Sequence, residues 1–194
     1  MLYQSLLCNK RVVLFFSVLL ISISVSSQST FEDKKSDSLL KQKFGWKTFD
    51  EKEFSIQAPH TFERPKKKAG FIIFAPLESP DDKFKENVNL IIQDLAGKNI
   101  DLDKFTDISV EQIKNYIKNN EITENKKLKN ENGEYQKFIY SGDVGAFSLK
   151  FEQYCWIVNE KAYILTFTAE KEKFDSNYQE FVEVVLNSFV LKVK

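Results

Sequence analysis

The sequence of 194 residues predicts an α+β fold, in which an antiparallel β-sheet is flanked by helices. Two patterns lead to this prediction. Apolar and polar residues alternate, as in strands, in four segments before and four segments after a stretch with helical spacing. A second stretch with helical spacing lies near the C-terminus. Because the strands have apolar residues on both faces, the two helices are expected to cover the two sides of the sheet.

The first 27 residues have the pattern of a secretory signal peptide. Lys10 and Arg11 form a positive start, and an apolar run follows at Val12–Val25. Small residues at the end of this run predict cleavage after Ser27. The alternative is an uncleaved anchor, although the run is short for a membrane span, which needs about 20 apolar residues. We therefore expect export to the periplasm or the extracellular space, with no transmembrane span in the mature chain.

Composition limits what the mature chain can be. Residues 28–43 are polar and are expected to form a flexible linker, and residues 44–194 are expected to form one domain. Lys plus Arg and Asp plus Glu are balanced at 28 each, so the chain lacks the basic excess of a nucleic-acid-binding protein. With the leader removed, Cys155 has no second cysteine with which to form an internal disulfide. The mature protein is expected to be a monomer.

Four strands are expected before the first helix. Trp46–Phe49 and Phe54–Ala58 have the pattern of a hairpin that ends at Pro59. Phe71–Ala75 is apolar on both faces, which is typical of a central strand. The clearest alternation occurs in Glu86–Leu95. Its core-facing residues are expected to be Val88, Leu90 and Ile92.

Helix starts are expected at two places. Asp101 has the position of an N-cap for a helix at 102–119. Ser176, with Gln179 as its capping-box partner, has that position for the last helix. The apolar stripes are Leu102, Phe105, Val110, Ile113, Tyr116 and Ile117 in the first helix, and Phe174, Tyr178, Phe181, Val182, Val185 and Phe189 in the second.

Four more strands are expected between the helices, joined by short turns. The first has the composition of an edge strand, because it is rich in lysines, which keep an exposed strand edge from pairing with other chains. An Asn-Gly pair predicts a hairpin turn at Asn130–Gly133, and two glycines predict the next turn at Ser141–Gly145. The four strands are expected at 121–128, 134–140, 146–158 and 162–169.

With these elements in order, the chain resembles the PsbP-like superfamily, as a bacterial-type exported member. The resemblance rests on the strand, proline and aromatic pattern of Phe54–Phe62, the Asn-Val strand Glu86–Leu90, the helix start Asp101–Phe105, and the strand Ala162–Phe167 ahead of the last helix. It implies an α/β/α sandwich around an antiparallel sheet. The superfamily includes accessory proteins of photosystem II, DcrB-like envelope proteins and a distant Ran-binding relative. The resemblance therefore implies docking on a partner, and it implies no shared set of catalytic residues.

Few residues suggest chemistry. His60 is the one histidine, and no Gly-x-Ser-x-Gly elbow accompanies it, so we expect no catalytic residue. Cys155 is expected to be a small buried hydrophobe, and the alternative is a reactive or intermolecular thiol. Carboxylates at 81, 82, 101 and 103 could together hold a hard cation such as calcium. Helix capping and a solvated turn are the expected roles instead, and no metal or cofactor is expected.

A basic loop is the candidate partner-binding site. Its residues are Arg64, Lys66, Lys67 and Lys68. Such a loop can meet an acidic envelope protein or an anionic surface, or it can simply keep the protein soluble. We predict a non-enzymatic, exported accessory or binding protein of the cell envelope. The alternative is a periplasmic carrier of a small ligand or lipid, because the many aromatic residues could line a pocket. An enzyme is the third hypothesis.

Overall fold

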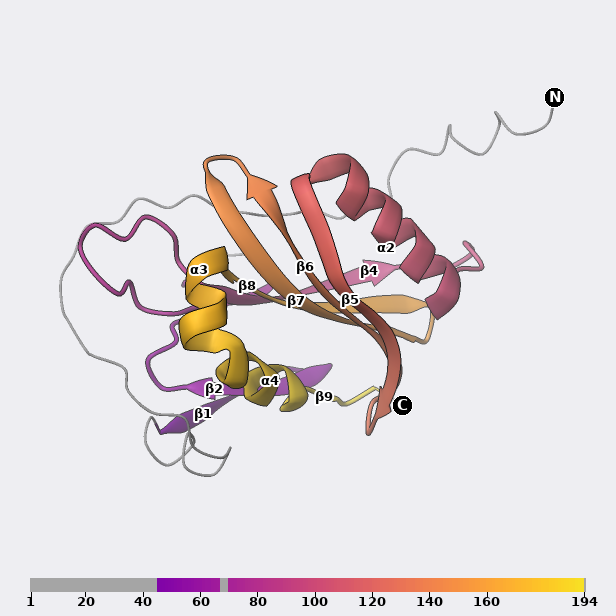
Figure 1. Ribbon diagram of the computed structural model, residues 1–194. Coiled ribbons are helices and arrows are strands. Elements are labelled where there is room, and N and C mark those ends of the chain that lie inside the picture. The colour runs from indigo at the N-terminus through magenta and orange to yellow at the C-terminus, as the bar shows by residue number, and fades with distance from the viewer. Residues whose placement is uncertain (1–44, 67–69, 194) are drawn as a thin grey trace.

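The computed structural model describes residues 45–66 and 70–193, which form two antiparallel sheets (Figure 1). The larger sheet has six strands in the order β3-β4-β8-β7-β6-β5, and the smaller has three in the order β1-β2-β9. The strands are β1 (Trp46–Asp50), β2 (Phe54–Pro59), β3 (Phe71–Phe74), β4 (Asn87–Asp94), β5 (Lys118–Asn130), β6 (Gly133–Val144), β7 (Phe147–Val158), β8 (Lys161–Glu170) and β9 (Val190–Leu191). The helical segments are α2 (Leu102–Tyr116) and a C-terminal run of α3 (Lys171–Lys173), the π-helical η1 (Phe174–Tyr178) and α4 (Gln179–Asn187).

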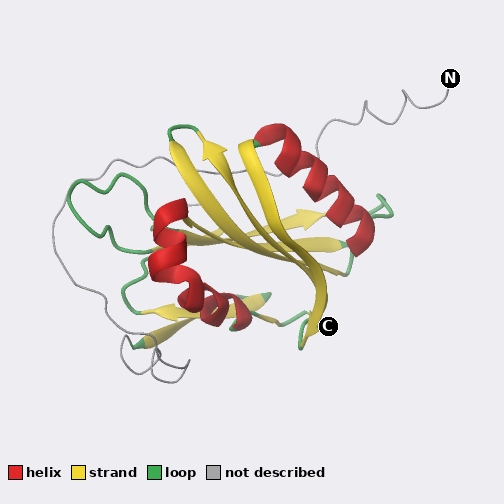
Figure 2. Cartoon of the chain, in the orientation of Figure 1, coloured by secondary structure: helices red, strands yellow, loops and turns green. Residues whose placement is uncertain are grey.

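The two helical segments cover opposite faces of the six-stranded sheet, as the sequence predicted (Figure 2). Phe105 and Ile113 of α2 pack in one core cluster with Phe138 and Phe151 of the sheet. The C-terminal helical run and the small sheet pack on the other face, in a cluster that contains Trp156. The α+β prediction of an antiparallel sheet between helices is therefore confirmed. The separate sheet β1-β2-β9 was not foreseen.

Strand β7 shows how one sequence builds both cores. Leu149, Phe151 and Cys155 point to the α2 face, and Tyr154 and Trp156 point to the other. Successive side chains of a strand point to opposite faces, so a strand covered on both sides needs apolar residues at both sets of positions. Its neighbour β8 is buried along almost its whole length for the same reason.

Strand β3 does not lie where the sequence placed it. It forms the edge of the six-stranded sheet and pairs with β4, whereas a central position was expected. Phe71 and Ile73 are buried, and Ile72 and Phe74 are half-buried. The second face of β3 is therefore only partly covered by other residues. An apolar run in the sequence does not distinguish such partial burial from full burial.

The first helix begins as expected and ends early. The side chain of Asp101 caps it, accepting a hydrogen bond from the backbone N–H of Lys104 at 2.8 Å. The helix ends at Tyr116, not at residue 119, and β5 begins two residues later. Ile117 takes the buried position at this end of the stripe, and Tyr116 is 74% exposed, against expectation.

The predicted N-cap of the last helix is also wrong. Helical structure begins at Lys171, so Ser176 lies inside the run, in η1. Its hydroxyl donates back to the carbonyl oxygen of Glu172 at 3.0 Å, as serine does within helices. The apolar stripe is nevertheless buried, including Phe174, Tyr178 and Val182.

Strand β6 continues through the turn predicted at Ser141–Gly145 and ends at Val144. Gly142 is needed there for close approach between strands: a β-carbon at this position would lie 2.7 Å from the carbonyl oxygen of Lys118 and would also overlap Ile117. In β4, Val88 and Leu90 are buried as expected, but Ile92, near the end of the strand, is 37% exposed.

Some predictions fall outside the described residues. These are the signal peptide at 1–27, the linker at 28–43, and Lys67 and Lys68 of the basic loop. Within residues 45–66 and 70–193, none of the helices combines the length and apolar character that crossing a membrane requires.

Candidate functional site

The described part of the basic loop follows β2 and returns the chain toward β3. Arg64 forms an ion pair with Glu51 in the turn between β1 and β2, and its guanidinium lies 5.3 Å from the ring centre of Phe71. Lys66 is exposed. Arg64 therefore anchors the start of the loop to the small sheet and to β3, while Lys66 faces solvent. Lys67 and Lys68 lie outside the described residues.

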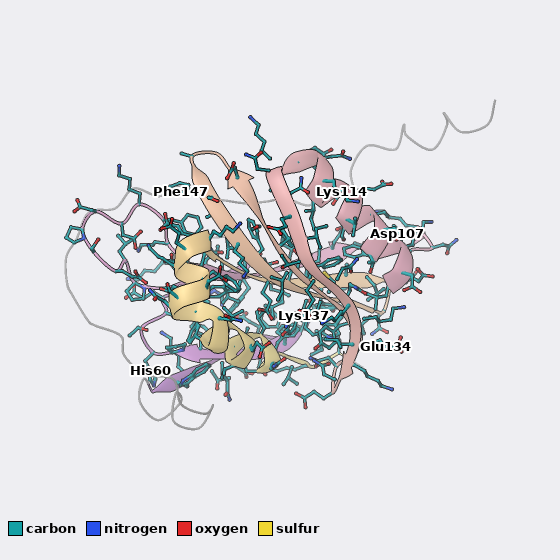
Figure 3. The ribbon with its side chains drawn as sticks, viewed as in Figure 1. His60, Asp107, Lys114, Glu134, Lys137 and Phe147 are labelled. Carbon is teal, nitrogen blue, oxygen red and sulfur yellow. The ribbon has the colours of Figure 1, made fainter. Side chains whose placement is uncertain are left out.

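His60 lies at the end of β2, at the margin of the molecule (Figure 3). Its backbone N–H donates to the carbonyl oxygen of Gly45 at 3.0 Å, and its carbonyl accepts from Lys47 Nζ at 3.0 Å. Among residues 45–66 and 70–193, no carboxylate forms an ion pair with its imidazole. The arrangement lacks the acid partner that would orient histidine as a general base.

Cys155 is fully buried on the α2 face of the large sheet, as expected. Gln153 Nε2 donates to its sulfur at 3.3 Å, and Gln153 Oε1 accepts from the hydroxyls of Tyr140 and Thr166, each at 3.2 Å. Burial raises the pKa of the Cys155 thiol to about 12. A thiol in this state is a poor nucleophile, because the thiolate is the reactive form.

Three of the four aspartates that could have held a cation have separate roles, and the fourth, Asp81, is exposed. Asp101 caps α2, and Asp103 pairs with Lys127 of β5. Asp82 accepts hydrogen bonds from the backbone N–H groups of Glu78 and Phe84, each at 3.2 Å. The part of the chain that the structure describes contains no cluster of three or more His, Cys, Asp or Glu side chains placed to hold a metal ion.

A buried ion-pair cluster lies on β6 and β7 beside α4. Lys137 Nζ lies 3.1 Å from Glu152 Oε1, 3.1 Å from Glu183 Oε1 and 4.0 Å from Glu124 Oε1. The hydroxyl of Tyr154 also donates to Glu152, at 3.0 Å. Figure 3 shows Lys137 near the centre of the molecule, and its side chain is 9% exposed.

The two buried charges of this cluster stabilise each other. Burial raises the pKa of Glu152, and the ion pair with Lys137 opposes that change. Burial alone would lower the pKa of Lys137, but its carboxylate partners raise it overall. The lysine therefore stays charged, and the cluster has the character of a structural ion pair.

A second buried cluster surrounds Lys173, at the end of α3. Its Nζ lies 2.7 Å from Glu170 Oε2, 2.9 Å from Asp82 Oδ2 and 3.5 Å from Glu86 Oε1. The Glu86 side chain is completely buried. Burial raises its pKa to about 7, although Lys173 opposes this change.

Neither cluster was predicted, although the sequence contains a signal for both. Lys137 and Glu152 lie on the core-facing side of strands whose period is two, Lys137 two residues after Tyr135 and Glu152 two residues before Tyr154. Glu86 likewise precedes Val88 by two residues, so the period places its carboxylate on a core face. Charged residues at such positions are almost always paired when buried.

The aromatic residues that could have lined a ligand pocket pack against each other. Trp156 lies 5.2 Å from both Tyr135 and Phe189, measured between ring centres. Phe167 contacts Phe174 and Tyr178 in the same core. The carrier hypothesis remains a prediction that no specific contact favours.

The comparisons with known proteins bear on the fold. No family model matches the sequence, and no curated protein matches it either. The solution structure of cyanobacterial PsbP (CyanoP) from Synechocystis sp. PCC 6803 is similar with a TM-score of 0.55 and 14% identity, over 76% of this chain and 93% of that one. The crystal structure of LpqN, involved in cell envelope biogenesis of Mycobacterium tuberculosis, is similar with a TM-score of 0.56 and 9% identity, over 79% of this chain and 95% of that one. This chain therefore has the PsbP-like fold, the fold of the superfamily that its sequence resembles.

Proposed function

We propose that the protein is a non-enzymatic, exported accessory module of the cell envelope, which docks on another protein. The observation that carries this proposal is the state of its chemically capable side chains. His60 has no acid partner among the described residues, Cys155 is a buried thiol, and Asp82, Asp101 and Asp103 cap or pair. Among the described residues, side chains held in these states favour a function in binding over one in catalysis.

Export is supported by the leader at 1–27, with its positive start, apolar run and small residues. The PsbP-like fold supports an accessory role, because a protein of this fold, LpqN, is described as involved in cell envelope biogenesis. A fold alone does not specify a function, so the docking surface has to be argued from residues.

The basic loop is the proposed docking surface. Arg64 is held by Glu51 and by the Phe71 ring, so the start of the loop is fixed relative to the fold. Beyond it the sequence gives three consecutive lysines, Lys66 to Lys68, of which Lys66 is exposed. A loop whose start is anchored and which carries several cations suits an acidic partner protein, because complementary charge speeds and orients association.

Charge reversal tests the proposal. The variant Lys66→Glu/Lys67→Glu/Lys68→Glu is compared with Lys98→Glu/Lys104→Glu/Lys114→Glu, which changes the net charge equally at exposed positions on and beside α2. Each tagged protein is incubated with envelope extract from its host, crosslinked and recovered. We expect the amount of recovered partner to fall at least 10-fold with the loop variant and to stay unchanged with the control variant. Equal recovery by both variants would remove the loop from the proposal.

A second arm separates a protein partner from an anionic membrane. The unmodified protein and both variants are sedimented with vesicles of anionic lipid in the absence of extract. If the unmodified protein binds the vesicles and the loop variant does not, the docking partner is a lipid surface and not a protein. Each basic residue close to the membrane would then contribute about 1 kcal/mol to binding. No vesicle binding, together with loss of crosslinked protein, is the result that the proposal expects.

A further inference from the structure

The segment between β3 and β4, residues 76–86, lies against the C-terminal helical run, and we call it the strap. The hydroxyl of Tyr178 donates to Glu78 Oε1 at 3.0 Å, and Asn177 Nδ2 donates to the same oxygen at 3.4 Å. Lys173 pairs with Asp82, near the middle of the strap. Figure 1 shows this loop beside α3. The strap is therefore attached to α3 and η1 through polar side chains at three positions.

Glu86 closes the base of the strap and is its most unusual residue. Its carbonyl oxygen accepts from the N–H of Ala75 at 2.8 Å, which joins the two ends of the strap. Its side chain is 0% exposed, and within the described ranges neither carboxylate oxygen accepts a close hydrogen bond from another residue. Lys173, 3.5 Å away, and the backbone N–H of Glu86 itself only partly oppose the effect of burial on its pKa. Leaving a buried ionised carboxylate without hydrogen bonds is costly, so this group favours its protonated form.

Glu152 provides a contrast within the same protein. It is also buried, at 2% exposure. Its Oε1 accepts from the Tyr154 hydroxyl at 3.0 Å and lies 3.1 Å from Lys137 Nζ. Burial thus acts on both glutamates, but Glu152 has closer donors, which stabilise its buried anion better.

The charges around Glu86 do not balance. From α3, Lys173 supplies one positive charge, and it makes closer contacts with Asp82 of the strap and Glu170 of β8 than with Glu86. Glu78 of the strap and Tyr178 of η1 are the other titratable groups that face it. One ammonium group therefore serves three carboxylates, and Glu86 is the one with the weakest contact. The arrangement favours a neutral Glu86 while the strap is closed.

We propose that Glu86 is a proton-operated latch: the strap is closed on α3 and η1 while Glu86 holds its proton, and it loosens when that proton is released to solvent. Ionisation puts a third negative charge beside Lys173 and leaves it buried. Opening of the strap hydrates this charge, at the expense of the contacts of Glu78 and Asp82 with the helical run. Because burial raises the pKa of Glu86 to about 7, the change falls near neutral pH.

Carbon-detected NMR tests the latch on the unmodified protein. The side-chain carboxyl carbon of Glu86 is followed from pH 4 to pH 9, together with the backbone amides of Glu78, Asp82 and Phe84. We expect the Glu86 signal to titrate with a midpoint near 7, and the strap amides to shift with the same midpoint. A Glu86 midpoint below about 5, close to that of an ordinary glutamate, or strap amides that do not follow Glu86, would overturn the proposal.

Two variants sharpen the result. Glu86→Gln has no titrating proton at this position, so its strap amides should lose the transition near pH 7 and remain at their closed-state positions. Glu152→Gln removes the other buried glutamate and should leave the strap transition unchanged. A transition that persists in Glu86→Gln, or disappears in Glu152→Gln, would contradict the latch. If Glu86→Gln does not fold, the titration of the unmodified protein decides the question alone.

Discussion

Lys137 Nζ lies 3.1 Å from Glu152 Oε1, where strands β6 and β7 pass beneath α4. This pair joins the large sheet to the C-terminal helical run, because Glu183 of α4 contacts the same ammonium. Both charges of the sheet are removed from water, so each depends on the other for its solvation. The pair is thus a structural requirement of the fold and a clear target for mutation.

Removing one member of this pair should cost more than removing both. Lys137→Met leaves Glu152 buried without its cation, and we expect the free energy of unfolding to fall by about 3 kcal/mol. In Lys137→Met/Glu152→Gln the amide still accepts from Tyr154, so about 1–2 kcal/mol should be recovered. Urea unfolding of the single and double variants measures the coupling. Lys126→Met, at a lysine whose side chain is 65% exposed, should cost less than about 1 kcal/mol. Strictly additive losses would show that the pair is not coupled.

Glu86 should make stability depend on pH with a defined sign. Its folded-state pKa of about 7 lies above the ordinary value of 4.5, so between these values the folded state holds a proton that the unfolded state has released. The stability that Glu86 contributes is therefore present at acid pH and falls as pH rises toward 7. Glu86→Gln lacks this dependence. Between pH 5 and pH 8 its stability relative to the unmodified protein should rise by about 2–3 kcal/mol, measured by urea unfolding. A difference that is constant with pH would contradict the raised pKa.

Gly142 should tolerate no side chain. A β-carbon there would lie 2.7 Å from the Lys118 carbonyl oxygen, so Gly142→Ala forces β5 and β6 apart and should cost about 2 kcal/mol. The matched control is Gly97→Ala, where φ is +72° and no atom lies within 4 Å of the added carbon. Its cost should be that of backbone strain, about 1 kcal/mol. Thermal unfolding measures the stability of the two variants. An equal or larger loss of stability in Gly97→Ala would contradict the close approach of β5 and β6 at Gly142.

Cys155 should be unreactive in the folded protein. With a pKa of about 12, roughly one thiol in ten thousand is ionised at pH 8, and the side chain is fully buried. In a Cys8→Ser background, iodoacetamide at pH 8 should label no more than a trace before unfolding and the full amount in urea. Stoichiometric labelling of the native protein would show an accessible thiol and would reopen the reactive alternative.

The fold was predictable where periodicity decided the structure. The alternation in β4, β7 and β8 and the stripes of the two helices gave the correct elements, and their faces except at Ile92 and Tyr116, because burial on a strand or helix imposes a fixed repeat. The sequence could not show whether β3 lies at the edge or in the centre of the sheet. An apolar run indicates that a strand is buried, and it does not indicate how many strands pair with it. The end of α2 was missed because Tyr116 and Ile117 both fit a helical stripe, and only packing shows which is buried.

The site was less predictable. Capping by Asp101 could be read from one residue and its position. The clusters around Lys137 and Lys173 join residues that are far apart in the chain, such as Lys137 with Glu183 and Asp82 with Lys173. Such pairs depend on strand register and helix placement, which a single sequence does not define. The sequence did place Glu86 on a core face, and that was the signal available for its unusual state.

Site-specific photo-crosslinking in living host cells tests the docking claim most directly. A photoreactive amino acid replaces Lys66 in one strain and, as the control, Lys104 on α2, the helix that covers the opposite face of the large sheet. After irradiation, position 66 should form a discrete protein adduct in the envelope fraction, and position 104 should form none. An adduct at position 104 alone, or no adduct at position 66, would contradict docking through the basic loop.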